Sequence, residues 1–95
     1  MKIKEINTYE ELNKFLKKKC YDDEFLKYLL DELNKSLIDY YKYENDIDFN
    51  AFIKLRTVLC AYLSFKYNVI LFSIDLSEYF CRLNELDIDE FYKDL

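Results

Sequence analysis

Glycine, proline, histidine and tryptophan are all absent from this chain of 95 residues. Tight β-hairpin turns need a positive φ angle, which glycine and asparagine provide most readily. Only asparagine is available here, so a sandwich or barrel of many short strands is not expected. Helices lose least from that lack. The composition therefore favours an all-α fold.

The absence of histidine and glycine also excludes several kinds of chemistry. Serine or cysteine nucleophiles activated by histidine, histidine-ligated metals and a protonation switch near neutral pH all require an imidazole. The phosphate-binding loops of nucleotide enzymes require glycine where the backbone approaches the phosphate. Carboxylates could still act as acid or base groups, but no pattern places two of them together; the candidates are Asp39, Asp75, Glu78 and Glu85. We therefore expect a protein that is not an enzyme and has no cofactor.

Cysteine is scarce, with three residues that are not spaced as a C-x-x-C pair. An odd number without such a pair argues against a disulfide framework and against a zinc site. Cys60 and Cys81 fall on apolar helical stripes, where a free thiol behaves as a small hydrophobe. Free cysteines of this kind indicate a reducing, cytoplasmic setting. Residues 1–5 lack the apolar core of a signal peptide, and no apolar run approaches the ~20 residues of a membrane span, so we expect neither secretion nor membrane insertion.

One segment invites a metal interpretation. Residues 46–50 read Asp-Ile-Asp-Phe-Asn and match the opening of a calcium-binding loop, whose alternate residues supply oxygen ligands. The match then fails, because Ala51 stands where the loop needs glycine and Thr57 stands where it needs a bidentate glutamate. A helix start with two candidate caps explains the segment better, so we expect no metal site.

Apolar residues make up 52% of the chain, with ten tyrosines and eight phenylalanines. The segment 49–67 is the most apolar, and two adjacent helical stripes run through it. The first stripe is Phe49, Phe52, Ile53, Leu59, Cys60, Leu63 and Tyr67, and the second is Leu55, Val58, Tyr62, Phe65 and Val69. A helix that is apolar over so much of its circumference needs neighbours on several sides. We predict an all-α fold, a single domain over residues 1–95 in which four or five helices surround a central buried helix at about residues 49–67.

Five capping signals divide the chain into helices. They are Thr8 with Glu11, Asp22 with Asp23, Asp46 with Asp48, Asp75 with Glu78, and Asp87 with Glu90. The helix after the second signal should end near Glu44 or Asn45, since asparagine tolerates the left-handed conformation of a helix exit. In residues 69–74 bulky apolar side chains follow one another, and we favour a helical turn or a tight connection there over a short strand.

The negative charge is concentrated at the end of the sequence. Residues 1–73 carry 12 basic and 12 acidic side chains, whereas residues 74–95 carry 2 basic and 7 acidic ones, so the last 22 residues hold the whole net charge of −5. Such a surface attracts basic partners and repels nucleic acid and anionic lipid. Tyrosine offers a large contact area and is frequent at protein interfaces. The predicted partner-binding residues are Asp75, Glu78, Tyr79, Glu85, Asp87, Asp89, Glu90 and Tyr92.

These features predict a small acidic protein-binding module without catalysis. Its partner would be a larger, basic protein or nucleoprotein, and the expected type is an inhibitor from a phage or mobile element, such as an anti-CRISPR protein, an antitoxin or an immunity protein. Two alternatives remain open. A second copy could cover part of the central helix, which would make the chain a homodimer. The basic cluster Lys14–Lys19 could bind nucleic acid, although the acids of residues 22–24 at the start of the next helix oppose this.

Overall fold

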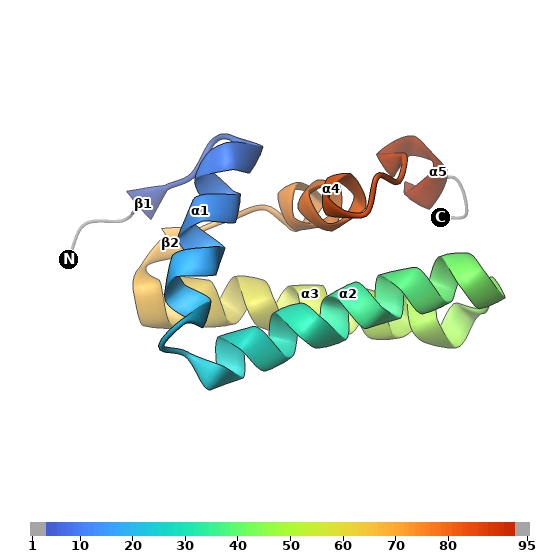
Figure 1. The fold of residues 1–95 in the computed structure, drawn as a ribbon, viewed down its shortest axis with the longest axis horizontal. Helices are drawn as coiled ribbons and strands as arrows, with labels where there is room; N and C mark the ends of the chain where they lie inside the picture. The colour runs from blue at the N-terminus through green and yellow to red at the C-terminus, as the bar shows by residue number, and fades with distance from the viewer. Residues whose placement is uncertain (1–3, 93–95) are drawn as a thin grey trace.

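A computed structural model describes residues 4–92 of the chain (Figure 1). Within this range, five helices and one pair of short strands follow one another along the sequence. The elements are β1 (Lys4–Glu5), α1 (Tyr9–Cys20), α2 (Glu24–Tyr43), α3 (Asp46–Tyr67), β2 (Val69–Ile70), α4 (Ser73–Leu83) and α5 (Ile88–Tyr92). The predicted all-α bundle is confirmed, with the larger of the two expected helix numbers.

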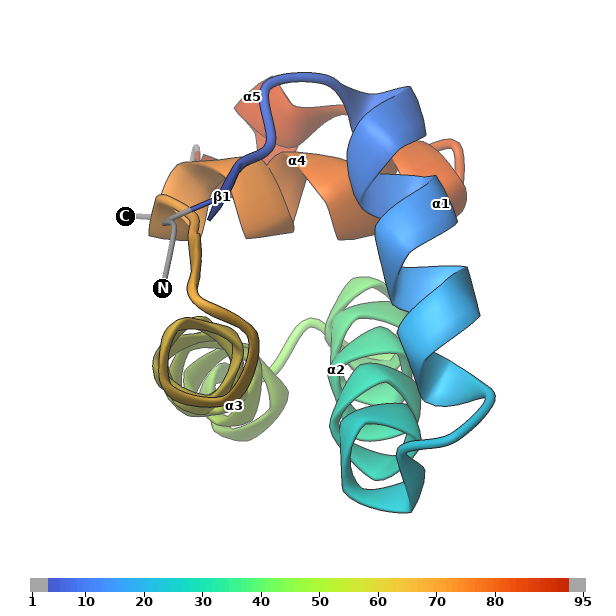
Figure 2. The ribbon, with the colours of Figure 1, turned by 90° about the vertical axis from the view of Figure 1, so that its left-hand side faces the viewer.

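The helices form two layers (Figure 2). One layer is a long hairpin of α2 and α3, which run antiparallel and share the most extensive contact between elements of the described chain. The other layer contains α1 and α4, which lie over the same side of this hairpin, and α5, which follows α4 (Figure 1). Every helix contributes buried side chains to one continuous core, for example Leu16, Leu33, Leu59, Phe80 and Phe91.

Two of the predicted helix starts are confirmed at the level of hydrogen bonds. The Thr8 Oγ1 accepts a hydrogen bond from the backbone N–H of Glu11 at 3.1 Å and caps α1. The Asp23 Oδ1 accepts one from the backbone N–H of Leu26 at 3.0 Å and caps α2. In both cases a short side chain with an oxygen atom reaches a donor that the helix itself leaves unpaired.

α2 ends at Tyr43 with Glu44 as its C-cap, which confirms the predicted end near Glu44 or Asn45, but the roles of the connecting residues differ from the prediction. Glu44, and not an asparagine, takes the left-handed conformation after α2, with a φ angle of 52°. Asn45 instead caps α3, because its Oδ1 accepts from the backbone N–H of Asp48 at 2.8 Å while its Nδ2 donates to the Asp48 carboxylate at 2.7 Å. Asp46 and Asp48 lie in the first turn, where acids suit the positive end of the helix dipole, so the prediction that they cap α3 was wrong.

The segment after α3 contains a strand that the sequence did not favour. Asn68 ends α3 in the left-handed conformation, with a φ angle of 56°. β2 then pairs in parallel with β1, so the preference for a helical turn or a tight connection at residues 69–70 was wrong. The strand forms because the N-terminal segment supplies a partner from far away in the sequence, which local periodicity does not reveal.

α4 begins earlier than its predicted capping signal. Phe72 occupies the cap position without a side-chain hydrogen bond, and its carbonyl oxygen accepts from the backbone N–H of Asp75 at 3.0 Å. Asp75 and Glu78 therefore lie inside the helix and do not form a capping box, contrary to the prediction. Asp87 does precede α5, and its Oδ1 accepts a hydrogen bond from the backbone N–H of Asp89 at 2.9 Å.

The longest helix, α3, is covered on one side more than on the other. Its first apolar stripe is fully buried at Phe52, Leu59 and Leu63. Its second stripe is open in part, since Val58 is 44% exposed and Phe65 is 90% exposed. The reason is that the second layer of helices lies on a single side of the α2–α3 hairpin (Figure 2). No helix within residues 4–92 combines the length and the apolar character that crossing a membrane requires.

Candidate functional site: an acidic cleft

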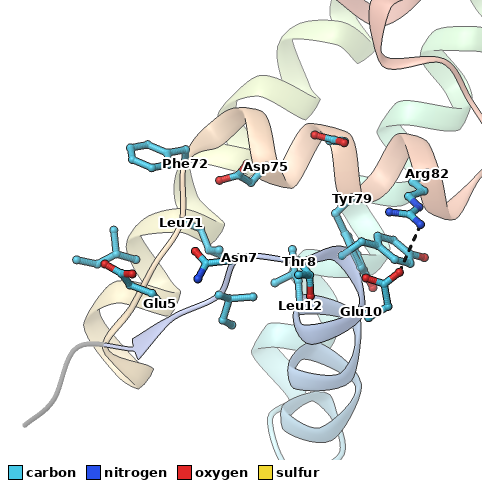
Figure 3. Close-up of a pocket in the computed structure, with 14 residues that line it drawn as sticks. Glu5, Asn7, Thr8, Glu10, Leu12, Leu71, Phe72, Asp75, Tyr79 and Arg82 are labelled. Carbon is cyan, nitrogen blue, oxygen red and sulfur yellow. Dashed lines mark hydrogen bonds and ion pairs between the residues drawn. The ribbon is translucent and has the colours of Figure 1, made fainter.

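A cleft opens where the two parallel strands end and their chains separate. β1 leads into α1 and β2 leads into α4, so the cleft lies between the start of α1, the strand pair and α4 (Figure 3). Its volume is about 750 Å³. Pockets that bind ligands commonly measure ~300–1,000 Å³. The lining residues are Glu5, Ile6, Asn7, Thr8, Tyr9, Glu10, Leu12, Ile70, Leu71, Phe72, Asp75, Glu78, Tyr79 and Arg82.

Buried side chains hold the walls of the cleft in place. Ile6 and Val69 belong to the core and fix the strand pair against the helices. Leu12 from α1 and Tyr79 from α4 are buried where they line the cleft. The Tyr79 hydroxyl donates a hydrogen bond to the Asn13 Oδ1 at 2.9 Å, which joins α4 to α1. Burial raises the pKa of Tyr79 to about 12, so this donor keeps its proton at neutral pH.

Four exposed carboxylates line the cleft: Glu5, Glu10, Asp75 and Glu78. Arg82 is the one basic residue of the lining, and it forms an ion pair with Glu10 at 3.4 Å. Four negative groups and one positive group give the lining a formal charge of −3. No other lining carboxylate has an ion pair within residues 4–92. Like charges gathered in a concave site produce a negative potential that attracts cations.

The Arg82 guanidinium also lies over an aromatic ring at the edge of the cleft. Its guanidinium carbon lies 4.4 Å from the centroid of the Tyr9 ring. The Tyr9 ring in turn lies against Tyr79, with the two centroids 5.3 Å apart. Figure 3 shows the Arg82 side chain reaching from α4 toward Glu10 on α1. One wall of the cleft therefore already holds a guanidinium that contacts both a ring face and a carboxylate.

The six acids predicted to bind a partner are divided by the fold. Asp75 and Glu78 lie on α4 and line the cleft. The other four are exposed on the α4–α5 connection or on α5, outside the cleft lining: Glu85, Asp87, Asp89 and Glu90. The prediction therefore named part of the acidic cleft together with a separate acidic surface.

The two predicted tyrosine anchors are both engaged inside the protein. Tyr79 is 6% exposed and belongs to the core, which does not fit a role as a surface anchor. Tyr92 is half-buried, and its hydroxyl accepts a hydrogen bond from the Arg56 Nη1 at 3.1 Å. The same Nη1 donates to the Ser77 hydroxyl at 2.7 Å, while the buried Arg56 Nε has no hydrogen-bond partner within residues 4–92.

Sequence reasoning missed Glu5 and Glu10, which supply half of the carboxylates in the cleft. Both lie in the part of the chain where acidic and basic residues balance, and both are distant in sequence from α4. The one local signal was the Thr8 cap, which sets where α1 begins and therefore which face of α1 carries Glu10. The parallel pairing of β1 with β2 brings this segment beside α4, and no local pattern indicates that pairing.

A second polar cluster lies where the start of α2 meets the end of α3. Its centre is the Asp23 carboxylate, which is 5% exposed. The donors to this carboxylate are the Leu26 N–H at 3.0 Å, the Tyr62 hydroxyl at 2.8 Å, the Lys66 Nζ at 3.0 Å and the Tyr67 hydroxyl at 2.5 Å. With its donors supplied by α2 and α3, Asp23 joins the two helices and has little capacity left for an outside ligand.

The protonation behaviour of this cluster follows from its contacts. Burial by itself raises the pKa of Asp23, but hydrogen bonds from Tyr67, Leu26, Lys66 and Tyr62 outweigh it and hold the pKa well below its usual range. Hydrogen bonds to Tyr62 and Asp23 raise the pKa of Lys66. Burial and the hydrogen bond to Asp23 raise the pKa of Tyr67 to about 12. Across the neutral range, Asp23 therefore stays ionised while Lys66 and Tyr67 keep their protons.

The basic cluster Lys14–Lys19 lies on α1. Three of its lysines are exposed, while the Lys19 Nζ lies 5.8 Å from the centroid of the Phe15 ring and 5.2 Å from that of Tyr67. Nucleic-acid binding through this cluster stays a prediction. A mobility-shift series would test it, because affinity for phosphates falls steeply as salt is added.

The structure also places the candidate metal-binding segment and the cysteines of the sequence. Within residues 4–92, no three side chains of the ligating types cluster closely enough to hold a metal ion. The calcium-like segment 46–50 is the first turn of α3 and not a loop. Burial raises the pKa of the Cys60 thiol and raises that of Cys81 to about 11, so both are poor nucleophiles at neutral pH.

Comparison of the chain with protein-family models, with characterised proteins and with solved structures found no match. Its function is therefore inferred from its own residues and their contacts.

Proposed function

We propose that this protein is a non-catalytic binding module that takes a cationic segment of a larger protein into the acidic cleft. The lining supports this function best, because it combines four carboxylates and a single arginine with apolar side chains such as Leu12, Leu71 and Phe72. Carboxylates attract the charged ends of lysine and arginine, and apolar surface accepts their aliphatic stems.

The dimensions of the cleft limit the size of the cationic segment that it can bind, which we call the guest segment. A volume of about 750 Å³ accepts several side chains of an extended or helical segment, but not a folded domain. Ile70 and Phe72 line the cleft and are 50% and 72% exposed, so they offer apolar contacts to the residues that flank the guest. Exposed apolar side chains beside a charged site are typical of protein interfaces.

The type of partner follows from the charge of the guest. Proteins that bind nucleic acids expose basic segments, and a carboxylate surface competes with nucleic acid for such segments. We therefore propose an inhibitor of a nucleic-acid-binding protein, in the manner of an anti-CRISPR protein, an antitoxin or an immunity protein. The acids outside the cleft, at residues 85–90, would add long-range attraction that speeds association.

The affinity for a basic amphipathic peptide tests this function. A labelled peptide with alternating arginine and leucine is titrated with the protein, and fluorescence anisotropy gives the dissociation constant. Asp75→Lys combined with Glu78→Lys should weaken binding by about tenfold to a hundredfold, because two attractive groups become repulsive. Both side chains are exposed, so circular dichroism should show an unchanged helical fold.

Glu85→Lys combined with Asp89→Lys is the matched control. It changes the net charge by the same amount at exposed residues outside the cleft lining. Only long-range attraction is lost, so the affinity should fall by less than about threefold. Equal losses in the two double variants, or no binding by the wild type, would contradict the cleft as the binding site.

Self-association is a second candidate function, favoured by the open face of α3. Val58 and Phe65 lie one helical turn to either side of Tyr62, and Phe25 packs edge-on against Tyr62 with ring centroids 4.9 Å apart. Phe25, Val58 and Phe65 are 49%, 44% and 90% exposed, which makes a patch that a second copy could cover. Light scattering after size exclusion should then give a dimer at micromolar concentration, and Phe65→Ser should give a monomer. A wild type that stays monomeric would exclude this candidate.

A further inference from the structure

We infer that the cleft selects arginine over lysine in the guest segment, and that Arg82 occupies the guanidinium site until an arginine of the guest displaces it. This selectivity rests on the proposed function and specifies which side chain the cleft recognises. It follows from the contacts that Arg82 makes with Tyr9 and Glu10, which negative charge alone does not explain.

Arg82 shows how a guanidinium fits this wall of the cleft. Its guanidinium carbon lies 4.4 Å from the Tyr9 ring centroid, and its Nη2 lies 3.4 Å from the Glu10 Oε1. Tyr79 packs against the Tyr9 ring, with the two centroids 5.3 Å apart and the ring planes inclined by 33°. Because Tyr79 is buried and its hydroxyl is bonded to Asn13, the Tyr9 ring packs on a fixed base.

A guanidinium suits this arrangement better than an ammonium does. A guanidinium is planar and weakly hydrated, so it stacks on a ring while its edge still donates to a carboxylate. An ammonium is compact and strongly hydrated, and it lacks the flat surface that stacking requires. Within residues 4–92, the lysine nitrogens over aromatic rings lie 5.1 to 5.8 Å from the centroids, and the Arg82 guanidinium carbon lies 4.4 Å from the Tyr9 centroid.

Arg82 is held loosely enough for a guest to replace it. The Arg82 side chain is 57% exposed and that of Glu10 is 72% exposed, and ion pairs in such settings contribute little to stability. Glu5, Asp75 and Glu78 also line the cleft and have no ion pair within residues 4–92. Other basic groups of the guest engage these carboxylates, while one guest arginine takes the place of Arg82, which turns toward solvent.

Two peptides test this selectivity. They share one pattern of alternating basic residues and leucine, with arginine at every basic position of one peptide and lysine in the other. Wild type should bind the arginine peptide about three- to tenfold more tightly. Arg82→Gln should raise the affinity for the arginine peptide by about threefold or more, because the ring face and Glu10 become free. The affinity for the lysine peptide should rise by less.

Variants of Tyr9 separate stacking from a general preference for arginine. Tyr9→Leu keeps apolar bulk but removes the ring face, so the preference for the arginine peptide should fall below about twofold. Tyr9→Phe keeps the ring and should retain the preference. Lys14→Gln is the matched control for Arg82→Gln, since it removes one positive charge at an exposed residue outside the cleft lining. Lys14→Gln should raise the affinity for both peptides slightly and by the same factor.

The possible outcomes distinguish this inference from the proposed function. The wild type could bind the two peptides equally, and the variant that combines Asp75→Lys with Glu78→Lys could bind neither. This result would overturn the selectivity and leave the proposed function in place. Weaker binding of the arginine peptide by Arg82→Gln would overturn the displacement of Arg82. No binding of either peptide by the wild type would overturn the function and the selectivity together.

Discussion

Asp23 and the carboxylates of the cleft are the same chemical group in opposite settings. Asp23 is 5% exposed, and one backbone N–H and three side chains donate hydrogen bonds to it. Glu5, Asp75 and Glu78 are exposed at the cleft and have no ion pair in the described part of the chain. Donors of the protein itself therefore fill the hydrogen-bonding capacity of Asp23, whereas the three cleft carboxylates face solvent.

This difference separates structural acids from acids available for binding. A buried carboxylate persists only where donors replace the hydration it loses, so Asp23 serves to hold α2 against α3. Carboxylates that share a cleft without donors repel one another, and a cation from outside relieves that repulsion. The role of an acid thus depends on the donors that tertiary packing brings to it. Three sets of substitutions and one change of pH test this contrast.

The largest effect is expected where a carboxylate enters the core without donors. Leu59 is fully buried on α3, so Leu59→Asp should cost more than about 5 kcal/mol and unfold the protein at neutral pH. Circular dichroism would show the loss of helix. Leu59→Ala, which leaves a cavity but no charge, should stay folded with a loss of about 2–5 kcal/mol. A folded Leu59→Asp protein would contradict the packing of α3.

Removing the saturated carboxylate should have the next largest effect. Asp23→Ala deletes the cap of α2 and leaves the Tyr62 and Tyr67 hydroxyls without their acceptor. We expect a loss of about 2–4 kcal/mol in the free energy of unfolding, measured with urea. Asp22→Ala, at the exposed neighbour, should change it by less than about 0.5 kcal/mol. Similar values for the two variants would mean that the donors around Asp23 do not stabilise the fold.

Acid should weaken the protein through the same group. The pKa of Asp23 is lower in the folded state than the ~3.9 of an unfolded aspartate, so the unfolded state takes up the proton first. The stabilisation is complete above about pH 5 and declines as the pH falls through the unfolded pKa toward the folded one. Urea unfolding between pH 5 and pH 2.5 gives the free energy of unfolding at each pH. This free energy should fall more steeply with decreasing pH for the wild type than for Asp23→Asn, by up to about 1.4 kcal/mol per pH unit. Equal slopes would assign the acid sensitivity to other carboxylates.

The smallest effect on stability is expected in the cleft. Asp75→Lys with Glu78→Lys should change the free energy of unfolding by less than about 0.5 kcal/mol per site, because both side chains are exposed and unpaired in the described chain. Thermal and urea unfolding would measure this change alongside the peptide affinity. A large loss of stability would show that these acids support the fold, and would remove the contrast with Asp23.

Local signals in the sequence predicted much of the helical framework. Thr8 and Asp23 were identified as caps because a cap bonds an N–H only a few residues away. The same reasoning failed at α3, where several capping residues follow one another and the backbone selected Asn45 over Asp46. It failed at α4 because Phe72, which is a poor cap by type, occupies the extended residue before the helix.

The cleft was beyond local reasoning because its parts are far apart in the sequence. Glu5 and Glu10 meet Asp75 and Glu78 only after β1 pairs with β2 and both chains diverge into helices. The burial of Tyr79 likewise depends on α1. The sequence therefore predicted two of the four cleft carboxylates, Asp75 and Glu78, as binding residues. It did not predict that they line a cleft.

The amino-acid sequence alone determined a glycine-free and proline-free helical bundle with its excess acid near the C-terminal end, because helix periodicity, capping and charge are properties of neighbouring residues. Which carboxylates receive hydrogen bonds from the protein and which face an open cleft depends on the packing of the helices. Hydrogen bonds and ion pairs between distant segments depend on how the layers pack, and the same acidic residue is structural or available according to what that packing places beside it.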